Sequence, residues 1–364
     1  MRPLFVAATI AAVTWLTFAE SVRAQARQSN RPAAMIDAAS AGPDFLLQGE
    51  YAGWAYIPNR GNQYFGLQVV ALGDGKFDAV GYLGGLPGNG WDRVAKKKLS
   101  GQVEEGKLVL TGPDDRLVVA GSSAVAVDSS GRELWRLIKM ARTSATMGLM
   151  PPSNATVLFD GRSTDQFQPG AKVTPDGLLM AGVMTKTPVQ GFRMHLEFRT
   201  PFMPTARDQA RGNSGVYIQR RYEVQILDSF GLDGAFNEAG SLYRQMPPDL
   251  NMALPPLTWQ TYDIWFTPPR FAEDGKTKTA NARITVLHNG VAVHWHREIT
   301  AKTGGGQQEG TQPLPIQLQD HGNPVMYRNI WIVPTDDNTY GQVSASDCSD
   351  CSRGRVRWRH RRCG

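Results

Sequence analysis

Residues 212–231 read GNSGVYIQRRYEVQILDSFG, and this stretch decides the fold. Polar and apolar side chains alternate along both halves of it. One parity carries Tyr217, Glu223 and Gln225, whereas the other carries apolar residues such as Val224. Alternation with a period of two is typical of a β-strand with one apolar face. The stretch therefore predicts two neighbouring strands that share a polar face.

The same pattern recurs on both sides of this stretch, between residues 157 and 334. The further β-like segments are 191–201 (GFRMHLEFRTP), 259–269 (WQTYDIWFTPP), 282–295 (ARITVLHNGVAVHW), 315–321 (PIQLQDH) and 327–334 (YRNIWIVP). Asn289 and Gly290 form a two-residue hairpin signal. Since no long stretch keeps a helical period, we expect little helix and a two-sheet sandwich or jelly roll.

A smaller antiparallel β domain is predicted before it, over residues 46–145. Segments 64–72 and 76–83 flank Gly73-Asp74-Gly75, where glycine supplies the positive φ of a tight turn. Further short apolar segments follow at intervals of about ten residues. This domain is expected to be a barrel or a half-sandwich, and Pro151-Pro152 marks the joint before the second domain at residues 155–334.

The two ends of the chain predict export. Residues 1–24 combine a charged start, a short apolar run and a small-residue cleavage site, which is the pattern of a signal peptide. Residues 25–45 read as a linker, and residues 335–364 read as a basic, cysteine-containing tail that we expect to be disordered. We expect a periplasmic, cell-surface or secreted protein with no membrane span after signal cleavage.

Charge and cysteines are concentrated in that tail. The formal net charge is +6, but residues 353–362 alone hold six arginines. The imbalance is therefore local, which argues against a nucleic-acid partner. Cys348, Cys351 and Cys363 lie there too, so no disulfide framework is expected in the folded body. Their spacing, with His360, matches zinc sites poorly, and one disulfide with a thiol left over is favoured.

The polar parity of the strands is rich in planar hydrogen-bonding groups. In residues 195–199, His195, Glu197 and Arg199 share one side of the strand. Any half-buried strand turns polar residues outward. A plain solvent face, however, is mostly Lys, Glu, Thr and Ser, whereas these strands carry amides, imidazole and aromatic rings. Such groups suit sugar hydroxyls, which both donate and accept hydrogen bonds.

Six blocks of the second domain resemble one family. They are residues 157–161 (VLFDG), 195–204 (HLEFRTPFMP), 212–231, 255–271 (PPLTWQTYDIWFTPPRF), 282–291 (ARITVLHNGV) and 318–332 (LQDHGNPVMYRNIWI). In this order they resemble the 3-keto-disaccharide hydrolase family, formerly a domain of unknown function. The resemblance implies an all-β fold: a concanavalin-like jelly-roll sandwich, here preceded by the smaller antiparallel β domain. It also implies a carbohydrate substrate.

The family chemistry that the resemblance implies begins at a sugar whose C3 hydroxyl has been oxidised to a ketone. The ketone acidifies the C2 hydrogen, so a base can remove it, the C1 aglycone leaves by elimination, and water adds afterwards. Matching the family blocks implies Glu223, His321 and Glu197 as catalytic residues. The implied substrate-binding residues are His195, Arg199, Asn213, Tyr217, Gln225 and Gln319.

The resemblance leaves room for one divalent cation that would stabilise the enolate oxygen, and it implies no organic cofactor. Glu223 and Asp228 are the candidate ligands. Asp228 has the opposite parity to Glu223, so it needs a bulge or a strand end to join it.

Two other functions stay open from the sequence. A lectin-like module that binds carbohydrate without catalysis uses the same fold. Ordinary two-carboxylate glycoside hydrolysis through Glu197 and Glu223 is the third, and there the separation of the carboxyl groups would set the stereochemistry.

Overall fold

The chain folds almost entirely into antiparallel β-sheets. The structure, a computed structural model, describes residues 32–57, 59–335 and 361–362. The predicted signal peptide at residues 1–24 and the three cysteines lie outside these residues. Within them, helix is confined to α2 (Gly42–Leu47) and the 3₁₀ turn η1 (Asp208–Ala210), in agreement with the missing helical period. No helix of the described residues has the length and apolar content to cross a membrane.

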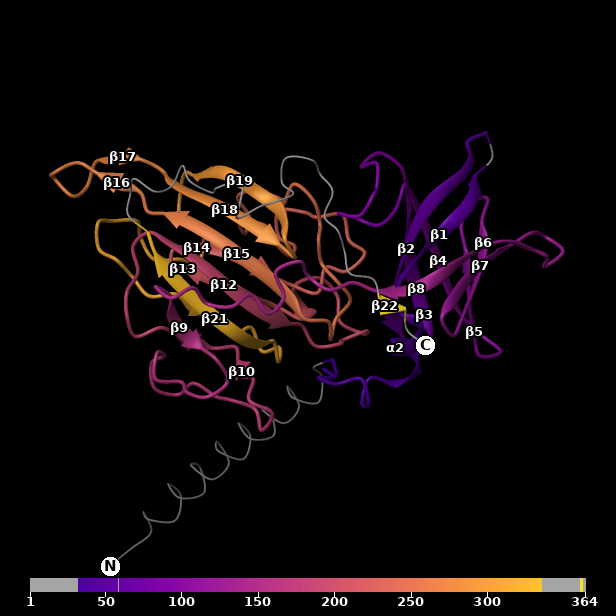
Figure 1. Cartoon of the computed structure of the whole chain (residues 1–364), viewed down its shortest axis with the longest axis horizontal. Coiled ribbons are helices and arrows are strands. Elements are labelled where there is room, and N and C mark those ends of the chain that lie inside the picture. Colours follow the sequence, from indigo (N-terminus) through magenta and orange to yellow (C-terminus); the bar gives the residue numbers. More distant parts are fainter. Residues whose placement is uncertain (1–31, 58, 336–360, 363–364) are drawn as a thin grey trace, which may run out of the picture. The chain divides into compact units, whose positions relative to one another are not determined.

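The first β domain is a closed barrel (Figure 1). Its strands follow one another in an up-and-down order: β1 (Gly49–Ile57), β2 (Gly61–Gly73), β3 (Lys76–Leu83), β4 (Lys96–Glu104), β5 (Lys107–Thr111), β6 (Arg116–Ala120), β7 (Ser123–Val127) and β8 (Glu133–Ala141). Strand β1 also pairs with β8, which closes the sheet. The short β22 (Arg361–Arg362) adds to the end of β8. Of the two architectures that the sequence allowed here, the barrel is therefore the one observed.

The barrel forms because alternate side chains point inward. On β2, Leu67, Val69 and Ala71 are fully buried, and they belong to one apolar cluster with residues from the other strands. Burying one such side chain as large as Leu or Val stabilises the fold by roughly 1.5–3 kcal/mol. The predicted turn between β2 and β3 is confirmed, with φ of 55° at Asp74 and 70° at Gly75.

The second β domain is a sandwich of two main sheets. The seven-stranded sheet contains β9 (Thr156–Phe159), β10 (Leu179–Met180), β12 (Phe192–Arg199), β15 (Gln260–Thr267), β18 (Ala282–His288), β19 (Val291–Ile299) and β21 (Met326–Pro334). The four-stranded sheet contains β11 (Val183–Met184), β13 (Ser214–Ile218), β14 (Tyr222–Ile226) and β20 (Gln317–Leu318). A small ribbon, β16 (Arg270–Phe271) with β17 (Lys278–Ala280), stands apart.

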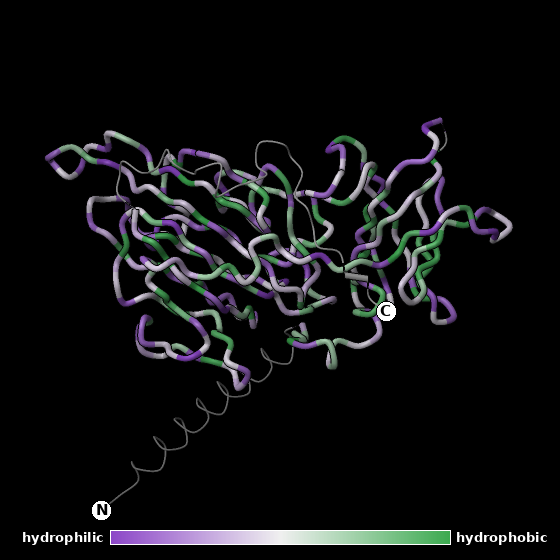
Figure 2. Tube along the Cα trace, viewed as in Figure 1, coloured by the Kyte–Doolittle hydropathy of each residue, from purple (hydrophilic) through white to green (hydrophobic). Residues whose placement is uncertain are grey.

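The apolar side chains at alternate positions of both sheets pack together in one core. Met194 and Leu196 of the large sheet and Val224 and Ile226 of the small sheet are fully buried in the same cluster. Figure 2 shows the matching pattern, with hydrophobic residues within the strands and hydrophilic residues at many hairpin tips. Since this parity fills the interior, the polar parity of each sheet points to one of the two outer faces of the sandwich.

A three-residue turn sets the register of the central hairpin, β13–β14. Gln219 and Arg220 both adopt positive φ, 49° and 50°, and the Arg221 amide donates to the Ile218 carbonyl at 3.0 Å. This turn pairs Tyr217 directly with Glu223 across the two strands. The two consecutive arginines, Arg220 and Arg221, therefore both lie in the turn.

Residues 142–155 connect the two β domains and lie on the outer face of the seven-stranded sheet. The Gly148 amide donates to Glu197 Oε1 at 2.7 Å, and Trp331 Nε1 donates to the Leu149 carbonyl at 3.2 Å. Farther upstream, part of the predicted linker pairs with the sandwich, since Met35 and Phe202 exchange two backbone hydrogen bonds. Residues 142–155 therefore cover polar side chains on the outer face of the seven-stranded sheet.

Candidate functional site

The alternating polar side chains predicted from the sequence lie on the outer face of the four-stranded sheet. Tyr217 pairs with Glu223, and Gly215 pairs with Gln225, so these residues form two adjacent rows across β13 and β14. Strand β20 continues the first row, because Gln317 pairs with Tyr217. We call this surface, with Tyr217, Glu223 and Gln225 at its centre, the Glu223 face.

Glu223 is the most perturbed carboxyl of this face. Its exposed fraction is only 3%. Burial raises the pKa of Glu223 to about 7, and the hydrogen bond from Tyr217 acts in the opposite direction. Burial and the neighbouring Glu223 raise the pKa of Tyr217, so the phenol stays protonated and donates. A carboxyl that titrates near neutral pH is matched to the work of a general base.

A glycine makes room for that carboxyl. A Cβ atom at Gly215 would lie 2.3 Å from Glu223 Oε1, so the side chain of Glu223 crosses β13 directly over Gly215. Glycine inside a strand often marks a close approach of this kind. The Gln225 amide lies on the next side, 3.3 Å from Glu223 Oε1. The carboxyl of Glu223 therefore lies between the phenol of Tyr217, the side-chain amide of Gln225 and the backbone at Gly215.

Loops distant in sequence extend the Glu223 face. Residues 240–243 run along the free edge of β14, where the Tyr243 amide donates to the Glu223 carbonyl at 3.0 Å. Thr303 Oγ1 accepts from the Glu223 amide at 3.0 Å. A Cβ atom at Gly305 would lie 3.3 Å from the Tyr217 hydroxyl. Sequence reasoning missed these residues, although the glycine run at 304–306 was a usable signal for a close approach.

Asn213 and Gln319 also join this face, at its edge. Gln209 connects Asn213 to the centre: its carbonyl oxygen accepts from Asn213 Nδ2 at 2.7 Å, and its side chain lies 3.0 Å from the Gln225 amide. The backbone N–H of Gln319 donates to the Gly215 carbonyl at 2.9 Å. The buried Gln319 Oε1 has no hydrogen-bond partner among the described residues.

His321 lies in the exposed turn after β20. The side-chain oxygen Oδ1 of Asn323, in the same turn, accepts from the backbone N–H of Asn213 at 2.7 Å, which connects the turn to the edge of the Glu223 face. Among the hydrogen bonds and ion pairs of the described residues, however, none joins His321 to Glu223. Its predicted role as a second acid or base stays a prediction.

His195, Glu197 and Arg199, which the resemblance implied as catalytic or substrate-binding residues together with Glu223, lie on another face of the sandwich, and a single site that contains them and Glu223 is wrong. Strand β12 pairs with β15 and β21 in the seven-stranded sheet, so its polar parity points to the opposite outer face. We call this second surface the Glu197 face. Alternation fixes which side chains share a face of one strand, but it does not say to which sheet the strand belongs.

The Glu197 face is a closed network. His195 Nδ1 lies 2.8 Å from Asp263 Oδ1, and Arg328 Nε donates to Glu197 Oε2 at 2.6 Å. Burial opposes ionisation of Glu197, but hydrogen bonds, including those with His195 and Arg328, outweigh it and lower its pKa to about 2. Arg199 stacks on Trp259 with 5.0 Å between the guanidinium carbon and the ring centre. Most of the polar atoms of these side chains are paired within the face, but His195 Nε2 and Asp263 Oδ2 have no hydrogen-bond partner among the described residues.

The predicted metal pair is not assembled. Asp228 forms a buried ion pair with Arg211, 2.7 Å from Arg211 Nε, and not with Glu223. No group of three His, Cys, Asp or Glu side chains with metal-ligand geometry occurs in the described residues. Because Arg211 holds Asp228 in this ion pair, the two carboxylates do not form the ligand pair that the sequence predicted.

Comparisons with known proteins identify the family of the second domain. The family described as 3-keto-alpha-glucoside-1,2-lyase-like domain matches residues 154–333. A proposed glycosyl hydrolase of solved structure from Parabacteroides distasonis is 32% identical, with 57% of this chain and 97% of that chain covered and a TM-score of 0.48. A second one from the same organism is 17% identical, with 50% and 94% covered and a TM-score of 0.38. No curated protein matches the chain.

The family match over residues 154–333 spans the sandwich, whose strands run from Thr156 to Pro334. All six blocks quoted from the sequence fall within residues 154–333, and the Glu223 face lies inside the same range. The chain belongs to the 3-keto-disaccharide hydrolase family, whose domain is described as 3-keto-alpha-glucoside-1,2-lyase-like, and it is a carbohydrate-active enzyme.

Proposed function

We propose that the chain cleaves 3-keto-glycosides on the Glu223 face, with Glu223 as the general base. The observation that carries the proposal is the buried carboxyl of Glu223, whose pKa is raised to about 7. The base must tolerate burial, which favours its neutral form, and must still be basic enough to take a carbon-bound proton. A carboxyl that titrates near pH 7 meets both conditions.

The proposed reaction has two steps. Glu223 takes the C2 proton, the electrons of that C–H bond form a C1–C2 double bond through the enolate, and the C1–O bond breaks to release the aglycone. The aglycone oxygen takes up one proton as it leaves. Water then adds its hydroxyl to C1, and the second of the two protons supplied by C2 and by water goes to C2, so that the products are a free 3-keto sugar and the aglycone alcohol. The Tyr217 phenol donates to the carboxyl and orients it.

Amide groups of the same face suit the polar oxygens of the substrate. Asn213, Gln225 and Gln319 lie around Glu223, and the buried Gln319 Oε1 lacks a partner among the described residues. Amides fixed in place can donate to the enolate oxygen as its charge develops and accept from sugar hydroxyls. They supply the positioning that the elimination needs.

The geometry disfavours ordinary hydrolysis by Glu197 and Glu223. The two carboxyl groups point to opposite outer faces of the sandwich, with the apolar core between the sheets. Packed sheets lie about 10 Å apart, so carboxyl groups on their far sides are more widely separated than the roughly 5–9.5 Å that such hydrolases use. The keto-dependent route requires only the Glu223 face.

The test compares a 3-keto-glucoside with its unoxidised parent. We expect the purified protein to release aglycone from the keto substrate alone, with or without a chelator, and to exchange the C2 hydrogen for deuterium in heavy water. Release from the unoxidised parent would instead indicate ordinary hydrolysis. Binding of both sugars without turnover would indicate a lectin-like module.

A further inference from the structure

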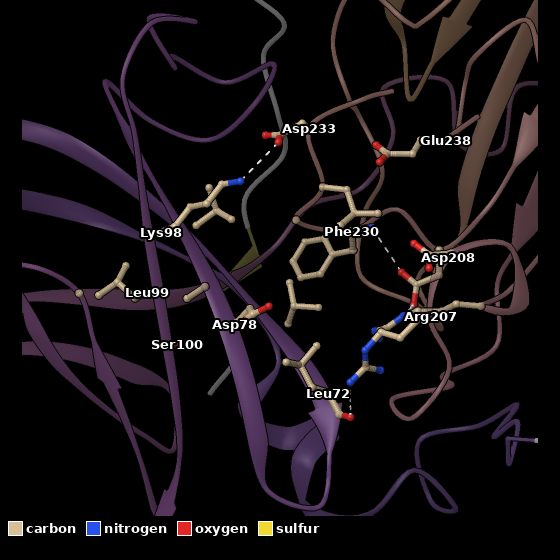
Figure 3. Close-up of a pocket in the computed structure, with 18 of the residues that line it drawn as sticks. Leu72, Asp78, Lys98, Leu99, Ser100, Arg207, Asp208, Phe230, Asp233 and Glu238 are labelled. Atoms are coloured by element: carbon tan, nitrogen blue, oxygen red, sulfur yellow. Dashed lines mark hydrogen bonds and ion pairs between the residues drawn. The ribbon is translucent and has the colours of Figure 1, made fainter. Parts of the chain in front are cut away.

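A cavity of about 600 Å³ lies between strands of the barrel and loops of the sandwich (Figure 3). The barrel contributes residues of β2, β3, β4 and β5, including Asp78, Leu99 and Ser100. The sandwich contributes residues between 207 and 238, including Phe230. Cavities of roughly 300–1,000 Å³ hold small ligands in other proteins. This one differs from the Glu223 face, and half of its wall lies outside the family domain.

The lining combines an apolar floor with a mixed-charge rim. Val80, Leu99 and Phe230 supply apolar surface, and Figure 3 shows the Phe230 ring between the labelled polar residues. Five carboxylates and three cations line the same space, which leaves an excess of two negative charges. That excess disfavours an anionic ligand, whereas uncharged hydroxyl groups can donate to carboxylates and accept from guanidinium groups.

One donor of the lining lacks a partner. Arg211 is only 6% exposed. Its Nε donates to Asp228 at 2.7 Å and its Nη1 to the Ala71 carbonyl at 3.1 Å, but its Nη2 has no hydrogen-bond partner among the described residues. A buried donor without an acceptor is costly, by about 1–3 kcal/mol. A rotation of the guanidinium group toward the cavity would bring this donor within reach of a ligand oxygen.

Residues 207–213 form a wall shared by the cavity and the Glu223 face. Arg207, Asp208 and Arg211 line the cavity. Gln209, between them, lies 3.0 Å from the Gln225 amide of the Glu223 face, and Asn213 ends the segment there. An occupant of the cavity is therefore one loop away from the proposed catalytic carboxyl.

We propose that this cavity is a second saccharide-binding site, which the barrel completes. A neutral sugar fits this lining. Its hydroxyl groups can bond to the charged side chains, it is not repelled by the excess of carboxylates, and its C–H faces can pack on the apolar residues. The ligand is either the leaving sugar of the substrate or a separate saccharide. In both cases the barrel is part of a carbohydrate site and more than a support for the sandwich.

Ser100→Trp tests the site from the barrel side. Ser100 is exposed on β4, is paired with Asp78 and lines the cavity, so a tryptophan there fills it without altering the family domain. Gln102→Trp is the matched control, on the same side of the same strand but outside the lining. If the Ser100→Trp protein has no melting transition, Ser100→Leu replaces it.

The readout is calorimetric titration of the full chain with cellobiose as neutral probe and glucuronate as anionic probe. We expect Ser100→Trp to remove one bound cellobiose per chain, or to weaken its binding at least roughly ten-fold, while Gln102→Trp matches wild type. Identical cellobiose titrations for all three proteins, or tighter binding of glucuronate than of cellobiose, would overturn the proposal.

A kinetic arm distinguishes the two sources of the sugar, and this arm alone rests on the proposed function. If the cavity takes the leaving sugar, Ser100→Trp raises KM for a 3-keto-disaccharide but not for a 3-keto-glucoside with a small aglycone. If KM is unchanged for both while cellobiose binding is lost, the cavity holds a separate saccharide. Failure of the wild type to cleave either substrate counts against the proposed function and leaves the titration as the test of the cavity.

Discussion

The two outer faces of the sandwich each bury a glutamate, yet the two carboxyl groups behave in opposite ways. Glu223 and Glu197 are 3% and 1% exposed. The pKa of Glu223 is raised to about 7, whereas the pKa of Glu197 is lowered to about 2. Burial alone raises both values, so the neighbours decide the outcome.

The neighbours differ in what they donate. Around Glu197, an arginine, a histidine, an asparagine and a backbone amide supply hydrogen bonds that favour the charged form. Around Glu223, the hydrogen bond that lowers the pKa comes from the neutral phenol of Tyr217, and it does not offset burial. A carboxylate with so many partners is fixed in place, whereas a poorly satisfied one can still take a proton. The comparison therefore separates a structural glutamate from a candidate base.

The largest expected effect is the loss of turnover in Glu223→Gln. The amide has the same shape but cannot accept the C2 proton, so we expect kcat to fall about 10²–10⁴-fold. Because Glu223 is already partly neutral near pH 7, the melting temperature should hardly change. Aglycone release and thermal unfolding are measured side by side. A large drop in melting temperature would instead mark Glu223 as structural and remove the contrast with Glu197.

Gly215→Ala tests whether the carboxyl must lie over the bare strand. The new Cβ would meet Glu223 Oε1 at 2.3 Å, and the flexible carboxyl end would move aside. A displacement of about 1 Å in a catalytic group can cost roughly 10²-fold in rate. Gly304→Ala is the matched control, since a Cβ there meets nothing within 4 Å. Equal activities of the two variants would show that the position of the carboxyl over Gly215 is unimportant.

Strand periodicity predicted the centre of the Glu223 face because the register of one hairpin determines it. Tyr217, Glu223 and Gln225 follow from alternation and a short turn, both of which are local in sequence. The same reasoning failed for Glu197. Its strand alternates equally well, but long-range pairing assigns it to the other sheet.

The rim of the site depends on tertiary structure and could not be read in the same way. At the free edge of β14, the backbone amide of Tyr243 donates to the Glu223 carbonyl, and the side-chain hydroxyl of Thr303 accepts from the Glu223 amide. The cavity requires the barrel to meet residues 207–238. Only the glycines at 215, 305 and 306 left a local signal of close approach.

Glu197→Gln sharpens the comparison from the opposite face. The amide cannot accept from Arg328, Asn329 and Gly148 together, so partly buried donors lose their acceptor. We expect the free energy of unfolding to fall by about 2–3 kcal/mol, with kcat unchanged. Glu298→Gln, in the exposed pair with Arg283, is the control and should cost less than about 1 kcal/mol. Urea denaturation measures both. A lower kcat at full stability would restore Glu197 as a catalytic residue.

The smallest effect concerns the pH profile and its dependence on Tyr217. A general base acts only when ionised, so kcat/KM should rise about ten-fold per pH unit below the pKa of Glu223 and level off above about 7. The Tyr217 hydrogen bond stabilises the ionised form and lowers this pKa. Tyr217→Phe should therefore move the midpoint of the profile upward, by roughly half a unit. A downward shift would mean that the phenol stabilises the protonated carboxyl, and an unchanged midpoint would mean that burial alone sets the pKa of Glu223.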